Sequence, residues 1–223
     1  MKTVTRRRLQ FLSGFVVYFA ALWFLWNSVA IYPLKIFVVL LHEVSHAAAL
    51  LATGGSVERI TLDPYQGGAT FGAGGNAFLV LSAGYLGSLG WGTLLVAAGR
   101  TRRLRPETVV GVVGALVVAL TILYVRNVFG FGFGVLFGAG LVLAAGRLPS
   151  LWNARLLLVL GLTSCLYAVL DIKSDVLDRP GLPSDAAMLS ELTGIPTVLW
   201  GGLWIGAALT VCVLLFRWAW RRA

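Results

Sequence analysis

The stretch PLKIFVVLLHEVSHAAALLAT, residues 33 to 53, decides the fold, because it is an apolar run long enough to cross a membrane as a helix. The same run contains one acid and the only two histidines of the chain, as His42, Glu43 and His46. An ionisable residue inside a span costs roughly 2.5 to 3.5 kcal/mol on insertion scales. The run therefore predicts both a membrane helix and a functional site within it.

The composition of the whole chain agrees with a membrane environment. Of its 223 residues 58% are hydrophobic and only 12% are charged, whereas about a quarter of the residues in soluble domains are charged. We expect a single-domain (1–223), all-α polytopic protein in the lipid bilayer, with about seven transmembrane helices. The predicted spans lie near residues 10–30, 33–53, 76–98, 108–125, 128–146, 153–175 and 196–217.

The net charge of +9 comes from short basic clusters at the predicted helix ends. This pattern is typical of membrane topology and does not favour nucleic acid as a partner. The clusters are Lys2 with Arg6, Arg7 and Arg8; Arg100 with Arg102, Arg103 and Arg105; and Arg217 with Arg221 and Arg222. With seven spans the first cluster lies opposite the other two, so charge alone does not decide the orientation.

The motif HExxH, formed by His42, Glu43 and His46, indicates a zinc site. Two histidines at i and i+4 share one helix face, so both can bind one Zn²⁺, with the glutamate near the metal-bound water. The pattern arises by chance in such a chain with a probability of about one per cent or less. The alternative is a polar cluster that satisfies itself by interhelical hydrogen bonds.

A catalytic zinc takes three protein ligands, and without a third histidine the remaining ligand must be a carboxylate. The candidates are Glu58, Asp63, Glu107, Asp171, Asp175, Asp178, Asp185 and Glu191. Asp171 matches the histidines in depth, because it lies about two turns before the polar end of its helix. Asp175 is the second choice, and Asp178 and Asp185 are interpreted as interfacial or capping residues. Asp171 has an alternative role as a helix-end carboxylate that faces water or a basic neighbour.

Between the second and third predicted helices, SVERITLDPYQGGATFGAGG (residues 56–75) alternates apolar and polar residues and then turns. This pattern predicts a small β-hairpin. Unpaired backbone groups are not tolerated in lipid, so the hairpin either joins the helices at the surface or lines a water-containing cavity.

The sequence resembles the site-2 protease family of intramembrane zinc metalloproteases, and within it the compact branch that lacks a PDZ domain. The resemblance rests on HEVSHAAALLATGG (42–55), GGAT (67–70), SAGYLGS (82–88), YAVLDIKSDVL (167–177) and SDAAMLSELTG (184–194). The family's third ligand is an aspartate in a Leu-Asp-Gly setting, of which Leu170 and Asp171 match the first two positions. Where the family has a Gly-Pro-Leu-x-Asn type motif, this chain has Tyr85 and Ser88 in place of the proline and the asparagine.

The resemblance implies a Zn²⁺ held by His42, His46 and Asp171, with Glu43 as the base that hydrolyses transmembrane segments of membrane-protein substrates. It also implies a multi-pass protein, expected in the cell membrane of a bacterium, with the segment after HExxH on the cytosolic side. Two rival functions are a metal-binding regulator without protease activity and a cation or proton transporter that uses His42, Glu43 and Asp171.

Overall fold

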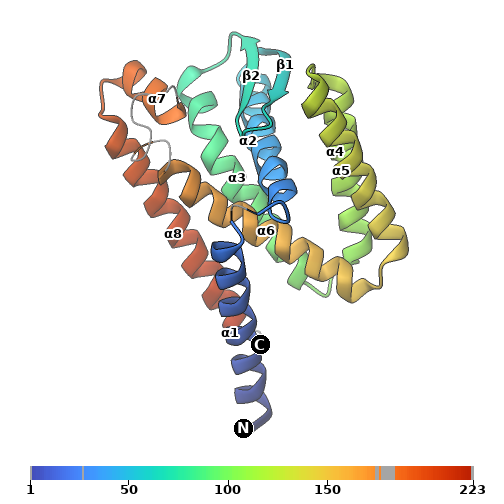
Figure 1. Cartoon of the computed structure of the whole chain (residues 1–223). Coiled ribbons are helices and arrows are strands. Elements are labelled where there is room, and N and C mark those ends of the chain that lie inside the picture. The colour runs from blue at the N-terminus through green and yellow to red at the C-terminus, as the bar shows by residue number, and fades with distance from the viewer. Residues whose placement is uncertain (1, 27, 174–175, 177–183, 222–223) are drawn as a thin grey trace.

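The structure is a computed structural model that describes residues 2–26, 28–173, 176 and 184–221, and these form helices and one small sheet (Figure 1). The elements are α1 (Lys2–Phe24), α2 (Tyr32–Ala52), β1 (Ser56–Leu62), β2 (Gly68–Ala73), α3 (Ala77–Arg100), α4 (Pro106–Tyr124), α5 (Val128–Arg147), α6 (Ser150–Lys173), α7 (Asp185–Thr193) and α8 (Thr197–Arg221). The expected all-α polytopic architecture with a β-hairpin after the second helix is confirmed.

Six of the described helices are long and apolar enough to cross a membrane, namely α2 to α6 and α8. The seventh expected span, residues 10–30, is not one continuous helix. Helix α1 ends at Phe24 and its apolar part, Leu12–Phe24, is shorter than a span requires. Pro33 stands in the first turn of α2, where its fixed φ favours the start of a new helix.

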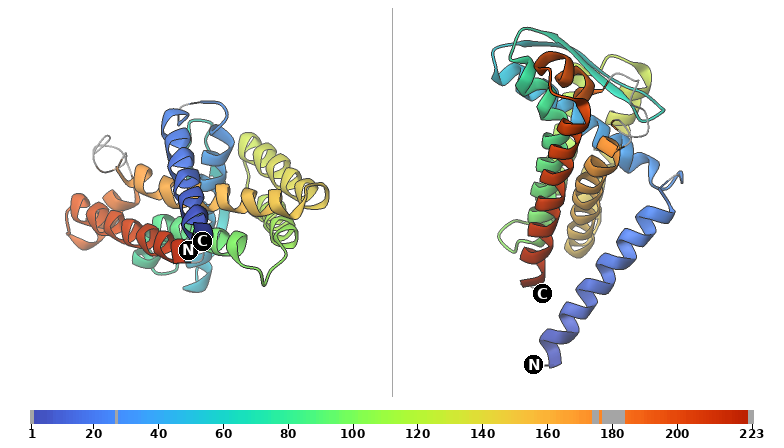
Figure 2. Two further views of the ribbon diagram at one scale, coloured as in Figure 1. Left: turned by 90° about the horizontal axis from the view of Figure 1, so that it is seen from below. Right: turned by 90° about the vertical axis from the view of Figure 1, so that its left-hand side faces the viewer.

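Helices α1 and α2 run in the same direction, from the end where the N-terminus lies towards the end where the hairpin lies (Figures 1 and 2). Helix α1 contacts α6 and advances in the same sense: the hydroxyl of Tyr18 is 2.7 Å from that of Thr163, and the Trp26 ring, just after α1, is 5.8 Å from that of Tyr167. Together α1 and α2 therefore make one broken crossing of the molecule. The number of crossings becomes even, whereas the seven expected spans would make it odd.

Close helix packing around α2 depends on glycines of its neighbour α3. A Cβ added at Gly87 would lie 2.1 Å from the Ser45 hydroxyl, and one at Gly92 would lie 2.7 Å from the Cys165 sulfur on α6. Because only hydrogen fits at these positions, α3 is held against both α2 and α6. The α4–α5 pair packs in the same way, since a Cβ at Gly114 would lie 2.6 Å from the Gly138 carbonyl.

The hairpin lies beside α2, and its two strands differ in what covers them. Strands β1 and β2 pair antiparallel, with an irregularity between Val57 and Arg59. The outer edge of β1 is covered by the α4–α5 connection, because the Arg126 amide donates to the Ile60 carbonyl at 3.1 Å and Asn127 bonds the backbone of Leu62. The other edge of the sheet is β2.

Candidate metal centre

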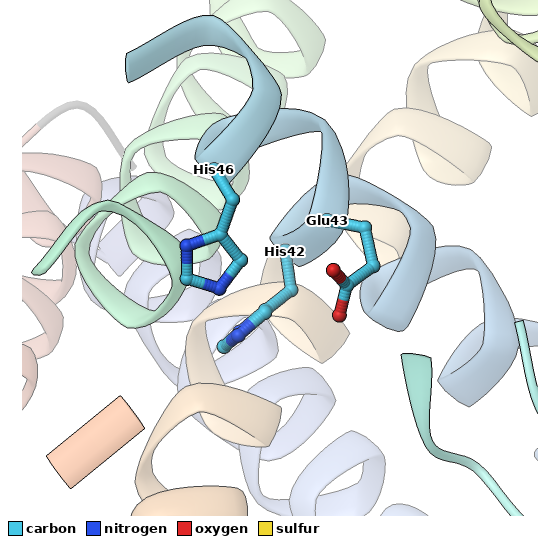
Figure 3. A group of neighbouring side chains, drawn as sticks. All are labelled: His42, Glu43 and His46. Carbon is cyan, nitrogen blue, oxygen red and sulfur yellow. The ribbon is translucent and has the colours of Figure 1, made fainter. Parts of the chain in front are cut away.

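His42, Glu43 and His46 project from one side of α2, and the two imidazoles point into the same space (Figure 3). The histidine ring centroids are 4.7 Å apart, and one potential ligand atom from each of the three residues lies within 4.8 Å of the others. The Nδ1 of His46 is 2.7 Å from the Val80 carbonyl. A carbonyl only accepts, so Nδ1 carries the proton and Nε2 keeps the lone pair that a metal needs.

Asp185 completes this group from a distant part of the chain. Its Oδ2 atom lies 3.0 Å from Nε2 of His42 and 3.2 Å from Nε2 of His46. The side chain is only 9% exposed, so its interpretation as an interfacial or capping residue is wrong. The capping residue is Ser184, whose side chain accepts from the Ala187 amide.

Helix α7 holds Asp185 at this position through its buried face. Ala186 and Leu189 are fully buried and pack with Tyr85 of α3 and Trp204 of α8. The helix is closed by Gly194, which adopts a φ of 73° that favours glycine. Asp185 is the first residue of α7, so packing one turn further on fixes the position of its carboxylate.

The donor set fits a tetrahedral zinc ion. Two ligands of a common zinc, each about 2.0 to 2.1 Å from the metal, are about 3.3 Å apart, close to the distances from Asp185 to the two histidines. The buried Oδ2 atom accepts no hydrogen bond of good geometry from the described residues, which is costly unless a metal or another partner satisfies it. Burial raises the pKa of the Asp185 carboxyl, but the adjacent imidazoles outweigh burial and hold that pKa below its usual range. The ionised carboxylate is the form that binds metal.

The two other late aspartates considered from the sequence are Asp171 and Asp175. Asp171, near the end of α6, lines the same cavity as His42 and Asp185. Asp175 lies outside the described residues. The structure thus places Asp185 against both histidines and Asp171 in the surrounding wall.

Glu43 is buried, at 4% exposure, and is oriented by the hairpin. The Thr70 hydroxyl lies 2.8 Å from Oε2 of Glu43 and 2.9 Å from its backbone carbonyl. A Cβ at Gly68 would lie 2.7 Å from Oε1, so glycine leaves room for the carboxylate. Strand β2 therefore positions the acid beside the two histidines.

The site lies in a cavity of about 820 Å³ with both polar and apolar walls. Its polar walls include the HExxH side chains, Asp171 and Asp185, and residues Gly67 to Thr70 of the hairpin complete one side. Of the two alternatives for the hairpin, the structure favours the cavity-lining one. The HExxH side chains and Asp185 therefore share one partly polar cavity with the hairpin.

In α3, Tyr85 and Ser88 stand where the family motif has its proline and asparagine, and their side chains lie in different surroundings. The Tyr85 ring lines the cavity, 5.0 Å from the His42 ring and edge-on to it. Ser88 is buried and donates to the Gly84 carbonyl, while its own carbonyl accepts from Ser164. In this chain the side chain at the asparagine position therefore serves helix packing.

We expect Gly84→Ala to remove most of the bound metal while leaving the protein folded. A Cβ at Gly84 would lie 2.3 Å from Nε2 of His42 and 2.6 Å from Nε2 of His46, in the space where the lone pairs converge. Gly90→Ala, on the same helix with no atom within 4 Å of the new Cβ, is the matched control. Elemental analysis should find zinc in the control and about tenfold less in Gly84→Ala. Equal zinc in both variants would contradict the proposed position of the metal.

A family model described as Peptidase M50B-like matches residues 15–215, which include every element of the site. No curated protein and no solved structure matches the chain. The resemblance to the site-2 protease family is confirmed by this match, because it covers nearly the whole length of the chain. With its membrane helices and its HExxH helix, the chain belongs to the Peptidase M50B-like family.

Proposed function

We propose that the protein is an intramembrane zinc metalloprotease that hydrolyses peptide bonds in or near transmembrane segments of other membrane proteins. The observation that carries this proposal is the convergence of His42, His46 and Asp185 beside the buried carboxylate of Glu43. We propose Asp185, in place of Asp171, as the third ligand. Three protein ligands leave a fourth position open, as catalytic zinc sites require.

When bound, zinc polarises the substrate carbonyl and makes a water molecule acidic near neutral pH. Glu43 then acts as general base: its carboxylate takes the proton from the attacking water and later returns it to the leaving amine. Thr70 holds Oε2 of Glu43, so the carboxylate keeps one orientation through both transfers. His46, with its Nδ1 proton held by Val80, presents Nε2 to the metal without reorganisation.

The hairpin supports a peptide substrate in extended form. Strand β2 is the sheet edge that the α4–α5 connection does not cover, and its residues 68–70 line the cavity beside Glu43. An unwound segment of a substrate can add to such an edge through main-chain hydrogen bonds. Pairing of this kind would bring a peptide carbonyl next to the metal and would stabilise the unwound segment.

Metal content and cleavage, measured together, test the function. We expect about one zinc per chain in the purified protein and cleavage of a co-expressed transmembrane reporter that stops when a chelator removes the metal. Stoichiometric zinc without turnover of any reporter would favour the regulator. Absence of tightly bound zinc would favour the transporter, which needs ionisable groups in the span but no ligand cage.

A further inference from the structure

The connection between α4 and α5, residues 125–127, contacts the hairpin along β1, which lies between this connection and β2 (Figure 1). The Arg126 amide donates to the Ile60 carbonyl at 3.1 Å. The Asn127 side chain makes two further bonds, in which Oδ1 accepts from the Leu62 amide at 3.1 Å and Nδ2 donates to the Leu62 carbonyl at 2.7 Å. The connection therefore bonds β1 as a third strand would, with an asparagine side chain in place of a peptide group.

The two β1 residues bonded in this way are the register partners of two β2 residues that lie against Glu43. Ile60 pairs with Thr70, and Leu62 pairs with Gly68. The Thr70 hydroxyl lies 2.8 Å from Oε2 of Glu43, and a Cβ at Gly68 would lie 2.7 Å from Oε1. Partners in an antiparallel pair are only about 4.5 to 5.5 Å apart between their Cα atoms. A shift of β1 would therefore move the groups that orient Glu43.

The connection is itself held by both of the helices that it joins. On the α4 side, the Arg126 guanidinium donates to carbonyls of the last turn of the helix, which satisfies groups that a helix end leaves free. On the α5 side, Gly130 leaves room for the asparagine, because a Cβ there would lie 2.6 Å from Oδ1 of Asn127 and 3.2 Å from Cβ of Leu62. Short contacts with α5 and with β1 thus fix the Asn127 side chain between them.

From these contacts we propose that Asn127 is a positioning residue for Glu43 and acts on it through the hairpin. The catalytic consequence rests on the proposed protease function, in which Glu43 is the general base. The proposed metal ligands come from α2 and α7, so a displaced hairpin should misorient the base and leave the metal in place. Misplacement of a reacting group by about 1 Å can lower a rate by up to about a hundredfold. We therefore expect loss of turnover without loss of zinc.

Hydrogen exchange tests the contact without requiring activity. Asn127→Ala removes the amide and Gly130→Ala fills its space, so the two variants disturb the contact independently. The matched controls are Asn153→Ala, which removes a buried asparagine bonded at the α5–α6 connection, and Gly132→Ala, whose Cβ would meet no described atom within 4 Å. Amides of residues 56–73 should exchange about tenfold faster in the two test variants and at the wild-type rate in the controls. Wild-type exchange in Asn127→Ala, or an equal increase in the controls, would overturn the inference.

A double-mutant cycle on cleavage of a transmembrane reporter tests the route from Asn127 to Glu43. Asn127→Ala should slow turnover about tenfold with zinc at the wild-type level. Thr70→Val removes the hydroxyl that holds Glu43, and the double variant should be barely slower than the slower single variant, because both changes release the same carboxylate. Additive losses, or loss of zinc in Asn127→Ala, would overturn the positioning role. If the hairpin exchanges faster in Asn127→Ala and the wild type cleaves no reporter, the contact stands and the proposed protease function fails.

Discussion

Glu43→Gln should reduce cleavage of a transmembrane reporter by at least about a hundredfold, because a general base contributes roughly 10² to 10⁴ to the rate. The amide keeps the size of the side chain and its contact with the Thr70 hydroxyl, but it cannot take a proton from water. Glu43 is not one of the three proposed ligands, so zinc should remain at the wild-type level. Turnover in cells, measured together with metal content of the purified protein, checks both parts.

Glu58→Gln is the matched control for this experiment. Glu58 is an exposed residue of β1 and makes an ion pair with Arg59 away from the cavity. The same change of one carboxylate to an amide should leave turnover near the wild-type rate. Equal turnover by wild type and Glu43→Gln would reject the proposed mechanism, whereas loss of zinc in Glu43→Gln would mean that the glutamate belongs to the ligand set.

The elements that follow from local sequence patterns were predictable. The two histidines, at i and i+4, had to share a helix face, and the alternation from Val57 to Leu62 predicted a strand. Ser184 as N-cap and Gly194 at the C-terminal end, with a proline two residues later, are local signals for the limits of α7. In each case neighbouring residues determine the conformation, through periodicity, capping or a positive φ.

Asp185 could not be placed from the sequence, because its position depends on how α7 packs. As the first residue of a capped helix, Asp185 has a favourable local role, because a negative charge stabilises a helix N-terminus. That role accounts for an aspartate at this position without any contact with His42. Only the burial of Leu189 between α3 and α8 turns the carboxylate towards α2. The available signal was its position in SDAAMLSELTG, the last of the segments that carry the family resemblance.

The described helices include six candidate spans where about seven were expected, and the difference has a related reason. Composition shows that the stretch around residues 10–30 is apolar, but it does not show the direction of the next helix. The contacts of Tyr18 with Thr163 and of Trp26 with Tyr167 set α1 against α6 so that both advance in the same sense, and such contacts across the chain have no local signature. One change of direction then moves the N-terminal end of α1 to the other end of the molecule (Figure 1).

Asp185→Ala should remove most of the bound zinc, because two neutral histidines alone lack both the third donor and its negative charge. Asp171→Ala, in the wall of the same cavity, should retain the metal and is the matched control. Elemental analysis of the purified proteins should find about one zinc per chain in the wild type and in Asp171→Ala, and about a tenth of that or less in Asp185→Ala.

Asp185→Asn separates loss of the ligand from loss of the fold. The amide preserves the size of the side chain and its place in the first turn of α7, where Ser184 and Leu189 hold the backbone. Zinc should still fall strongly, since an amide is a much weaker ligand than a carboxylate, while the melting temperature measured without metal should match that of the metal-free wild type. If Asp171→Ala empties the site and both Asp185 variants keep zinc, the third ligand comes from α6, and the contact of Asp185 with the histidines belongs to the metal-free protein alone.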